Sequence, residues 1–388
     1  MSRIDHPNVL FICPVFPPYK SWWWQSQVAR DFAKWLSKKW YNITIVTTKF
    51  DQLKKYEDAD WITIFRFSSY SRFLLKLWLY NPKWLFRWLK KNIQNYNLVF
   101  IHDIYTLYWF IVAKFCRRYK IPYILMPHWM WNISKQKDKI LLKKVFALLF
   151  SNYVSKNADK ILFCSENEKK DYEIPYIDSV VITNWINQDL WLEQLNDITD
   201  NDINSFRKKY GIGDKKIIFS MWRLVKVKRF DKTISYLSSF LQEHNEYILL
   251  IIWPNWWELE SLKKQIYDNK LDKNVKIIEG LFWKEKYIIY KISELFVLSS
   301  DLEWFPIVLC EAISSRMPCL ISKWCNIPWL DWFVEIFVNE DTFSKWLNKL
   351  IWWNFVMSQK YIDSFDINST IQKLDNLMKW IMLDYCHE

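Results

Sequence analysis

The fold is decided by the stretch Leu295-Phe296-Val297-Leu298-Ser299-Ser300-Asp301-Leu302-Glu303-Trp304-Phe305-Pro306-Ile307-Val308-Leu309-Cys310-Glu311. Its first four residues are apolar and predict a buried strand, and the turn after them leads into a helix. A helix N-terminus behind such a turn binds anions, because its free backbone N–H groups and the helix dipole point to the same place. Glu303 and Glu311 stand on either side of the turn, where their carboxylates can accept hydrogen bonds from sugar or ribose hydroxyls. The stretch therefore predicts a strand–turn–helix unit that binds a phosphorylated ligand.

Strands and helices alternate on both sides of this stretch, which is typical of parallel sheets with crossover helices. The segments that predict strands are 9–12, 43–47, 62–65, 98–101, 123–126, 160–164, 216–220, 247–252, 275–278, 295–298 and 318–321. The segments that predict helices are 25–39, 107–119, 138–156 and 340–388. A chain of 388 residues suggests two domains. We place the break in the polar stretch 181–204 and divide the chain into domains of residues 1–184 and 185–369, with a helix at about 370–388 packing back on the first.

The balance of glycine and tryptophan is abnormal, with 3 Gly and 27 Trp. Ordinary usage of about 7% glycine would give about 27 glycines. The tryptophans also stand where glycine is expected, as in the run Trp22-Trp23-Trp24 within a turn and at Trp40 after a basic helix. Because UGA is read as tryptophan in some genetic codes and as glycine in others, we interpret most of these tryptophans as glycines. The alternative is a genuinely tryptophan-rich protein.

A second motif precedes the first and reads Ser220-Met221-Trp222-Arg223-Leu224-Val225-Lys226-Val227-Lys228-Arg229-Phe230-Asp231. Arg223 and Lys228 can neutralise a diphosphate, the arginine as a planar fork and the lysine as a point charge. An isolated pair of this kind is usually a surface pair. Its position ahead of the glutamate pair favours a binding role.

With glycine at positions 222 and 304, the two segments resemble the G-R-L-x-x-x-K-x-x-D and E-x7-E motifs of retaining glycosyltransferases of family 4. Ala312, Met317-Pro318-Cys319 and Lys323-Trp324-Cys325-Asn326 agree with that pattern. The resemblance spans about residues 8–335. It implies the GT-B fold, in which two Rossmann-like domains with parallel sheets face each other across a cleft. Pro306, which lacks an N–H, Arg316 in place of a small residue, and tryptophan at every signature glycine depart from the pattern.

Three features of the first half are similar to the same family. Trp22 and Trp23 look like its glycine pair, which lets the backbone approach the donor phosphate. His128-Trp129 looks like its His-Gly, and Thr183-Asn184-Trp185-Ile186-Asn187 looks like its P-N-G-V-D segment at the domain crossover. His102 and Asp103, at the end of a predicted strand, are expected to line the acceptor site. A lone histidine is more often a structural residue, so the assignment of His128 depends on the resemblance.

The resemblance implies sugar transfer, with retention, from a nucleotide-diphosphate sugar (EC 2.4, hexosyltransferase type). The donor would lie in the second domain and the acceptor in the first, with neither cofactor nor metal. The diphosphate would be bound by Arg223, Lys228 and the turn around Trp304, Phe305, Ile307 and Val308. Glu303 would orient the donor sugar, Glu311 the ribose, and His128 would support the reacting sugar. We expect a glycan or lipid-linked acceptor in cell-envelope polysaccharide or glycolipid synthesis. The alternatives are a non-catalytic sugar-nucleotide-binding protein and a sugar-nucleotide epimerase of the same fold.

Positive charge is concentrated in the first half of the chain. Residues 1–184 hold 29 Lys and Arg against 14 Asp and Glu, whereas residues 185–388 hold 25 against 28. Between Asp60 and Asp103 there is no acidic residue, and basic residues alternate with Leu and Phe at helical spacing. This pattern favours an anionic membrane surface, and the alternative is an ordinary solvated helix face. The sequence carries no recognised nucleic-acid motif, and we expect no nucleic-acid partner.

The remaining features concern location. The seven cysteines are scattered without a C-x-x-C pair, which favours free thiols in a reducing compartment. The apolar segment 9–12 is too short for a signal peptide, and no run reaches the roughly 18 apolar residues of a membrane span. We predict a cytoplasmic protein that is peripheral on the inner face of the cytoplasmic membrane.

Overall fold

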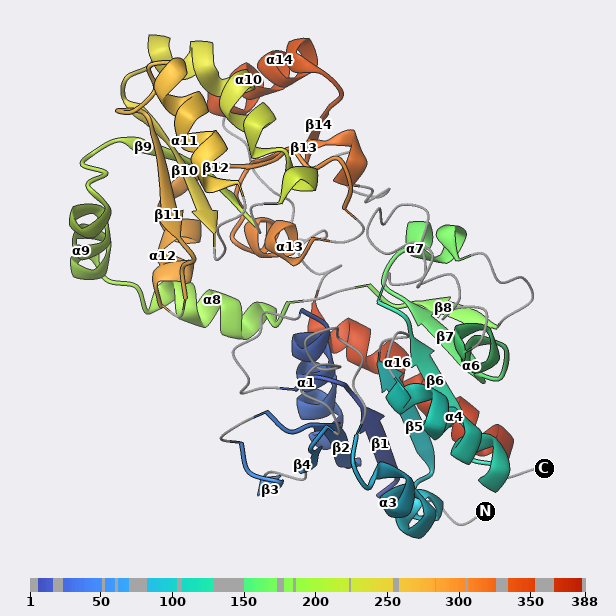
Figure 1. The fold of residues 1–388 in the computed structure, drawn as a ribbon. Helices are drawn as coiled ribbons and strands as arrows, with labels where there is room; N and C mark the ends of the chain where they lie inside the picture. Colours follow the sequence, from blue (N-terminus) through green and yellow to red (C-terminus); the bar gives the residue numbers. More distant parts are fainter. Residues whose placement is uncertain are drawn as a thin grey trace. The chain divides into compact units, whose positions relative to one another are not determined.

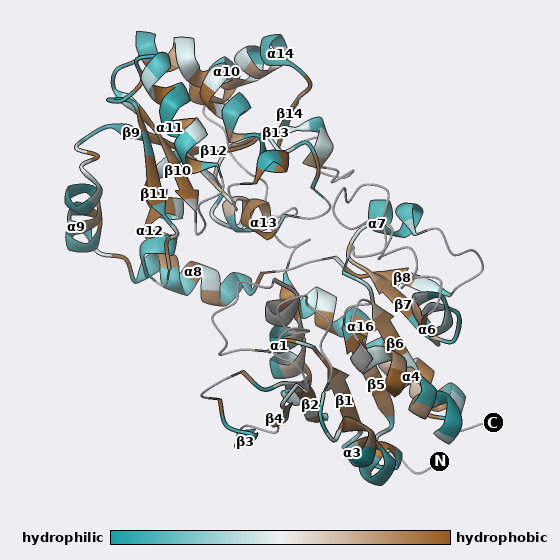
Figure 2. Ribbon diagram, viewed as in Figure 1, coloured by the Kyte–Doolittle hydropathy of each residue, from teal (hydrophilic) through white to brown (hydrophobic). Residues whose placement is uncertain are grey.

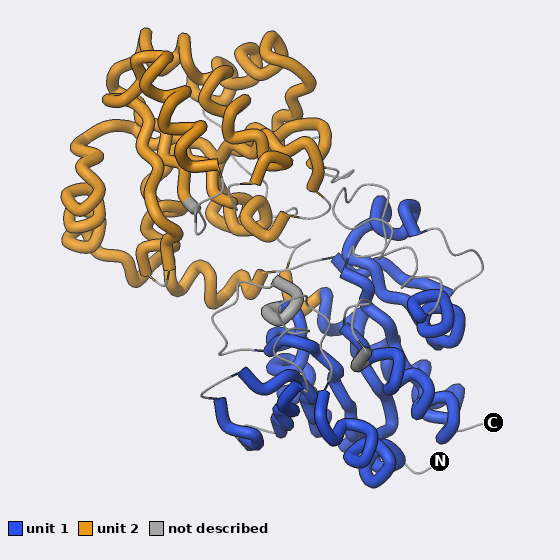
Figure 3. Tube along the Cα trace, in the orientation of Figure 1, with its two compact units in different colours: residues 1–183, 370–388 blue, residues 184–369 orange. Residues whose placement is uncertain are grey.

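The computed structural model describes residues 6–16, 24–50, 53–59, 62–69, 82–102, 107–128, 150–172, 178–183, 186–222, 225–253, 258–282, 284–303, 306–325, 334–352 and 366–385. The chain divides into two compact units (Figure 3). Unit 1 comprises residues 1–183 and 370–388, and unit 2 comprises residues 184–369. Each unit is built on its own sheet of mainly parallel strands, so the predicted two-domain α/β class is confirmed.

Unit 1 contains an eight-stranded sheet of order β3-β4-β2-β1-β5-β6-β7-β8 (Figure 1). The strands are β1 (Asn8–Ile12), β2 (Asn42–Thr48), β3 (Tyr56–Ala59), β4 (Ile62–Phe67), β5 (Leu98–His102), β6 (Tyr123–Met126), β7 (Lys160–Phe163) and β8 (Ser179–Val181). The described pairings are parallel except that of β3 with β4 at one edge. The helices are α1 (Trp24–Ser37), α3 (Leu85–Asn92), η1 (Ile93–Asn95), α4 (Leu107–Tyr119), α6 (Asn152–Lys156), α7 (Glu166–Asp171) and most of α16 (Ile367–Tyr385).

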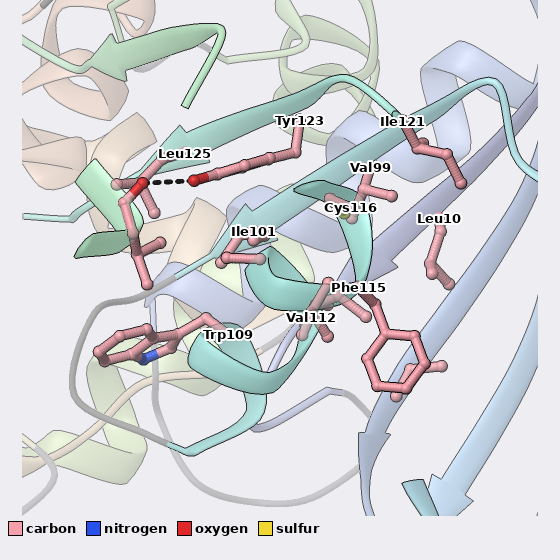
Figure 4. Packing of buried hydrophobic residues seen from close by; sticks show 14 of the residues in the cluster. Leu10, Val99, Ile101, Trp109, Val112, Phe115, Cys116, Ile121, Tyr123 and Leu125 are labelled. Carbon is pink, nitrogen blue, oxygen red and sulfur yellow. Dashed lines mark hydrogen bonds between the residues drawn. The ribbon is translucent and has the colours of Figure 1, made fainter. Parts of the chain in front are cut away.

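The core of unit 1 lies between its sheet and helices such as α4. Trp109 and Cys116 of α4 are fully buried with Ile101 of β5 in one apolar cluster (Figure 4). The ring of Tyr123 belongs to the same cluster, and its hydroxyl donates a hydrogen bond to the carbonyl of Val154 at 2.5 Å. A buried polar atom without a partner is costly, and this bond removes that cost.

Helix α16 returns from the end of the chain to unit 1. The hydroxyl of Tyr41 donates to Asp375 at 2.7 Å, and the hydroxyl of Tyr385 donates to Asp159 at 2.5 Å. Leu374, next to Asp375 on the same helix, is fully buried. The helix is therefore held to unit 1 by apolar packing, by a hydrogen bond near its middle and by another at its last residue, Tyr385.

Unit 2 contains a six-stranded sheet of order β11-β10-β9-β12-β13-β14, with parallel pairing throughout its described strands. The strands are β9 (Lys216–Met221), β10 (Tyr247–Trp253), β11 (Val275–Glu279), β12 (Ser293–Leu298), β13 (Cys319–Ser322) and β14 (Glu335–Phe337). The helices are α8 (Gln188–Asn196), α9 (Asp200–Tyr210), η3 (Lys226–Lys228), α10 (Phe230–Glu243), α11 (Leu259–Asp268), α12 (Lys284–Ile292), α13 (Ile307–Ser314), η4 (Lys323–Cys325) and α14 (Glu340–Trp352). In both units the central strands are hydrophobic along their length, while the helices also carry hydrophilic residues (Figure 2), as expected for parallel sheets covered on both faces.

The structure differs from the sequence prediction mainly in short or polar elements. The edge strands β3, β8 and β14 were not predicted, because three or four residues with polar members give little periodicity. The polar stretch chosen as the domain break contains helix α8, where Trp191 is buried and its indole N–H donates to Ser315 at 2.8 Å. Of the helix predicted at 138–156, residues 138–149 lie outside the described part. Among the described residues, no helix combines the length and the apolar character needed to cross a membrane.

Two helix ends show the same capping geometry with different residues. At the end of α9, Gly211 has φ 58°, and Ile212 N donates to the carbonyl of Arg207 at 2.9 Å. After α1, Trp40 has φ 70°, and Tyr41 N donates to the carbonyl of Leu36 at 3.3 Å. This geometry is the Schellman motif, which favours glycine at the left-handed position. A tryptophan thus occupies a backbone conformation that is usual for glycine.

Candidate functional site

The site of unit 2 lies where its strand order reverses. The chain runs from β9 to β10 and β11 on one side, and then returns to place β12 on the other side of β9. In open α/β sheets, ligands bind at the carboxyl ends of the strands at such a point. Lys228 follows β9 and Glu303 follows β12, so both sequence motifs reach the position that topology selects.

Lys228 and Glu303 form a buried ion pair. The Nζ atom of Lys228 lies 2.5 Å from Oε1 of Glu303, and their side chains are 7% and 2% exposed. The same carboxylate oxygen accepts a hydrogen bond from Ser300 Oγ at 2.8 Å. The N–H of Glu303 donates to the carbonyl of Trp324 at 3.0 Å, which fixes the backbone of the turn. The motif lysine and the first motif glutamate are therefore one unit, although 75 positions separate them.

A second charged group holds the two loops together. Arg229, whose φ is 52°, donates to both carboxylate oxygens of Asp231 and also to Asp301 at 2.8 Å. Lys232 donates to Asp301 at 3.1 Å. Burial opposes ionisation of Asp301, but the hydrogen bonds from Arg229 and Lys232 outweigh it and lower the pKa of the carboxyl. The loop after β9 is thereby tied to the loop after β12, which fixes the position of the Lys228–Glu303 pair.

Helix α13 begins beside this pair. Pro306 is its N-cap residue, and no side chain caps the first turn. The N–H groups of a first helical turn have no acceptor within the helix, so those of Ile307 and Val308 are suited to an anion, and their role in phosphate binding stays a prediction. The proline is outside the helix proper, and its missing N–H leaves the two following amides in place.

Glu311 stands one turn further along α13 and is 6% exposed. Its carboxylate forms an ion pair with Lys286 and accepts a hydrogen bond from the hydroxyl of Tyr290 at 2.8 Å. Burial, followed by the nearby carboxylate, raises the pKa of Tyr290, so its hydroxyl stays protonated and donates. Lys286, Tyr290 and Ser300 were missed by the sequence analysis. The spacing of Lys286 and Tyr290 by four positions on α12 was the available signal, because such residues share a helix face.

At the corresponding point of unit 1, the described part of the chain carries two neutral side chains. The strand order of unit 1 reverses between β1 and β5, and His102 is the last residue of β5. His128 follows β6, the next strand of the sheet, and its backbone has φ 51°. His102 Nδ1 and His128 Nε2 lie 2.9 Å apart, and the side chains are 0% and 3% exposed. Burial lowers the pKa of His102 to about 3, and burial together with His102 lowers the pKa of His128, so both rings are neutral.

The structure brings together some of the predicted site residues. Lys228 contacts Glu303, and His102 contacts His128, whereas the acceptor role expected of His102 has no support from a side chain that is fully buried. The predicted residues Ile307, Val308 and Glu311 lie on α13. The other predicted site residues, and the predicted crossover pair Asn184 and Trp185, lie outside the described part; these site residues are Trp22, Trp23, Asp103, Arg223, Trp304 and Phe305. Within the described residues, no group of three or more His, Cys, Asp or Glu side chains is placed to hold a metal ion.

Two protein-family descriptions match the chain. Residues 25–190 match Glycosyltransferase Family 4, and residues 202–329 match Glycosyl transferases group 1. The first match covers much of unit 1 and includes His102 and His128. The second contains Lys228 and the whole stretch from Glu303 to Glu311. A comparison with curated protein sequences gives no match.

Solved structures resemble the chain over nearly its whole length. Sucrose-phosphate synthase from Thermosynechococcus elongatus has a TM-score of 0.74 at 13% identity, covering 97% of this chain and 100% of that one. A glycosyltransferase from Rickettsia africae has a TM-score of 0.73 at 15% identity, covering 97% and 99%. Anabaena HepE in complex with UDP and glucose has a TM-score of 0.71 at 15% identity, covering 96% and 100%. At these identities the likeness is one of fold, and it confirms the predicted GT-B fold.

Proposed function

We propose that this chain, a glycosyltransferase of the GT-B type, transfers a sugar from a nucleotide-diphosphate donor to a glycan or lipid-linked acceptor with retention at the anomeric carbon. The observation that carries the proposal is the Lys228–Glu303 pair at the reversal point of unit 2, next to the uncapped start of α13. A lysine, first-turn amides and a carboxylate on one edge suit a ligand that joins a diphosphate to a sugar. HepE, which shares the fold, was solved with UDP and glucose.

The chemistry assigned to these residues is electrostatic. The bond between the anomeric carbon and the diphosphate oxygen breaks with its electron pair staying on the diphosphate, and a bond to the acceptor oxygen forms. The acceptor's proton leaves with the diphosphate or to solvent. Lys228, Arg223 and the amides of Ile307 and Val308 would stabilise the charge that develops on the leaving group.

Glu303 and Glu311 would bind the hydroxyl groups of the donor. Ser300 and Lys228 already occupy one oxygen of Glu303, which leaves the other for a sugar hydroxyl. Both oxygens of Glu311 have partners in Lys286 and Tyr290, which orient the carboxylate for the ribose. His128 would support the reacting sugar from unit 1. No cofactor and no metal enter this scheme.

The proposal includes glycine at most of the tryptophan positions. Trp40 and Trp84 both have positive φ, at 70° and 66°, and are 67% and 58% exposed. The indole N–H of Trp222, in the predicted G-R-L segment, is buried without a hydrogen-bond partner among the described residues. Sequencing the gene tests this part: we expect UGA at Trp22, Trp23, Trp222 and Trp304. UGG at all of them would make the tryptophans real and favour the non-catalytic binding protein.

The transfer itself is tested with labelled donors. Radiolabelled UDP- and GDP-sugars are incubated with the full chain and a membrane extract, and we expect label in a larger product. Glu303→Gln should lower turnover by about 10²- to 10³-fold, the usual loss for a preorganised group at a developing charge. Glu285→Gln is the matched control, because its ion pair with Lys209 is on the surface of the same unit. Equal turnover in the two variants would place the site elsewhere, and an epimerised free donor would identify an epimerase.

We also propose that the protein binds the inner face of the cytoplasmic membrane through α3 and α4. The described segments 82–102 and 107–128 contain eight Lys and Arg and no Asp or Glu. Phe86 of α3 is 59% exposed and packs edge-on against Phe115 of α4, with ring centroids 5.0 Å apart. Exposed aromatic and basic side chains on neighbouring helices suit an anionic bilayer, and each basic residue near it contributes about 1 kcal/mol.

Co-sedimentation with vesicles tests the membrane proposal. We expect the full chain to pellet with anionic vesicles, and to pellet less with neutral ones or at high salt. The triple variant Arg87→Gln, Lys90→Gln, Lys91→Gln should lose most of this binding. The double variant Lys263→Gln, Lys264→Gln on α11 of unit 2 is the control and should keep it. Equal, negligible pelleting on both vesicle types would leave α3 as a solvated helix face.

A further inference from the structure

Two consecutive serines follow β12, and their side chains have different partners. Ser300 is fully buried, and its Oγ atom donates to Oε1 of Glu303 at 2.8 Å. Ser299 is 2% exposed, and its Oγ atom instead donates to the carbonyl of Arg229 at 2.7 Å and lies 2.5 Å from Oγ1 of Thr233. Of these two neighbours, Ser300 is therefore the one that acts directly on the first motif glutamate.

The hydrogen bond between Ser300 and Glu303 can run in one direction only. The carboxylate of an ion pair accepts and does not donate, so the hydroxyl of Ser300 must be the donor. Oε1 of Glu303 also accepts from Lys228, whereas Oε2 has no hydrogen-bond partner among the described residues. The side chain of Glu303 is 2% exposed, and a buried acceptor without a donor is unfavourable. The second oxygen is therefore suited to a ligand hydroxyl.

Lys228 alone would leave the direction of this carboxylate poorly defined. A lysine ammonium is a point charge on a flexible stem, with three donors that rotate. In the proposed function the donor diphosphate also binds Lys228, so that the ammonium is then shared between two anions. Ser300 has a short side chain on a fixed backbone, because its carbonyl accepts a hydrogen bond from Ser322 Oγ at 2.5 Å.

We infer that Ser300 is a positioning residue, which keeps Oε1 of Glu303 turned toward itself and leaves Oε2 for a hydroxyl of the donor sugar. The inference rests on the proposed function for the role of Glu303. Ser300 acts through Glu303 and not on the reacting atoms. Its effect is therefore on the part of the donor that Glu303 binds, which is the sugar and not the nucleoside diphosphate.

The neighbouring serine provides a matched control. Ser300→Ala removes the donor to Glu303, and Ser300→Cys fills the same space with a weaker donor. Ser299→Ala also removes a buried hydroxyl after β12, but one that bonds to the carbonyls of Lys228 and Arg229. Thermal denaturation of the full chain establishes which variants are folded before binding is measured, and Ser300→Cys takes the place of Ser300→Ala if the alanine variant is unfolded.

The first measurement is calorimetric binding of four probes, UDP, UDP-glucose, GDP and GDP-mannose. We expect Ser300→Ala to weaken binding of the active sugar nucleotide by about 10-fold, the usual effect of losing a hydrogen bond to a charged group, and to leave binding of the matching nucleoside diphosphate unchanged. Any loss in Ser299→Ala should be the same for both ligands, because Ser299 contacts the loop of Lys228. An equal loss for both ligands in Ser300→Ala, or no loss, would overturn the inference.

The second measurement needs no ligand. Urea denaturation of the wild type, Ser300→Ala, Glu303→Leu and the double variant gives the coupling between the two side chains. We expect the two losses of stability to be non-additive, and additive losses would overturn the inference. A wild type that shows this coupling but binds the sugar nucleotides no more tightly than UDP or GDP would contradict the proposed function and not the hold of Ser300 on Glu303.

Discussion

In both units the strand order reverses beside the first strand, between β1 and β5 in unit 1 and between β9 and β12 in unit 2. The two reversal points carry opposite chemistry. In unit 2 a lysine and a glutamate are buried as an ion pair, and in unit 1 two histidines are buried as a hydrogen-bonded pair of neutral rings. The same reversal of strand order thus carries a charged pair in unit 2 and a pair of neutral imidazoles in unit 1.

The difference follows from what burial demands of each group. A buried charge costs several kcal/mol unless a counter-charge and hydrogen bonds accompany it, and Glu303 has both in Lys228 and Ser300. A histidine can instead lose its charge, because its pKa lies near neutrality. In unit 1 the two buried histidines are neutral, because burial lowers the pKa of both rings.

The largest effect is expected from breaking the charged pair. Lys228→Met leaves Glu303 buried without its counter-charge, and we expect the free energy of unfolding of unit 2 to fall by about 3–5 kcal/mol. The double variant Lys228→Met, Glu303→Leu removes both charges and should recover most of the loss. Urea denaturation of the three proteins measures these differences. A change below about 0.5 kcal/mol in the single variant would mean that water already solvates the pair.

A smaller effect is expected from acid on the neutral pair. Because the pKa of each histidine is lowered in the folded state, with that of His102 at about 3, the unfolded chain binds protons below about pH 6.5 that the folded chain does not. Above about pH 6.5 these two rings do not reduce the free energy of unfolding. Below it, the free energy of unfolding decreases as the pH falls, by up to about 1.4 kcal/mol per pH unit for each ring.

The variant His102→Phe removes one of the two rings that take up a proton on unfolding. Its free energy of unfolding should fall less steeply than that of the wild type between pH 7 and pH 5. Denaturant titrations at several pH values give both slopes. Parallel slopes would show that His102 takes up a proton in the folded state and that the pair is not neutral.

The sequence analysis was most successful where one segment carries its own signal. The buried strands were found because runs such as 247–252 are apolar from end to end. Lys228, Glu303 and Glu311 could be named as candidate site residues because their spacing matches a known pattern, and their role stays a prediction. Partners such as Lys286 for Glu311 and His128 for His102 were not predicted, because residues 25 and 26 positions away meet only after the sheet has formed. Helix α8 was not predicted for a similar reason. Its Trp191 is buried through contacts to Ser315 and Tyr290, which are distant in the sequence.

The two units also differ at the ends of their helices, where α9 of unit 2 has Gly211 and α1 of unit 1 has Trp40 in the same Schellman geometry. A non-glycine residue in the left-handed region costs about 1–2 kcal/mol, and the side chain of Trp40 is 67% exposed, so it recovers little by burial.

The smallest effect is expected from giving the end of α1 the same residue, glycine, that is found at the end of α9. Trp40→Gly should raise the free energy of unfolding by about 1 kcal/mol, because glycine adopts the left-handed conformation without strain and its greater flexibility in the unfolded chain offsets only part of the gain. Trp109→Gly is the opposite case: Trp109 lies fully buried inside α4, so we expect a loss of at least about 3 kcal/mol. Denaturant unfolding of both variants measures the contrast. If Trp40→Gly destabilised the protein, the contact of the Trp40 ring with His6 would stabilise the fold by more than the backbone strain costs.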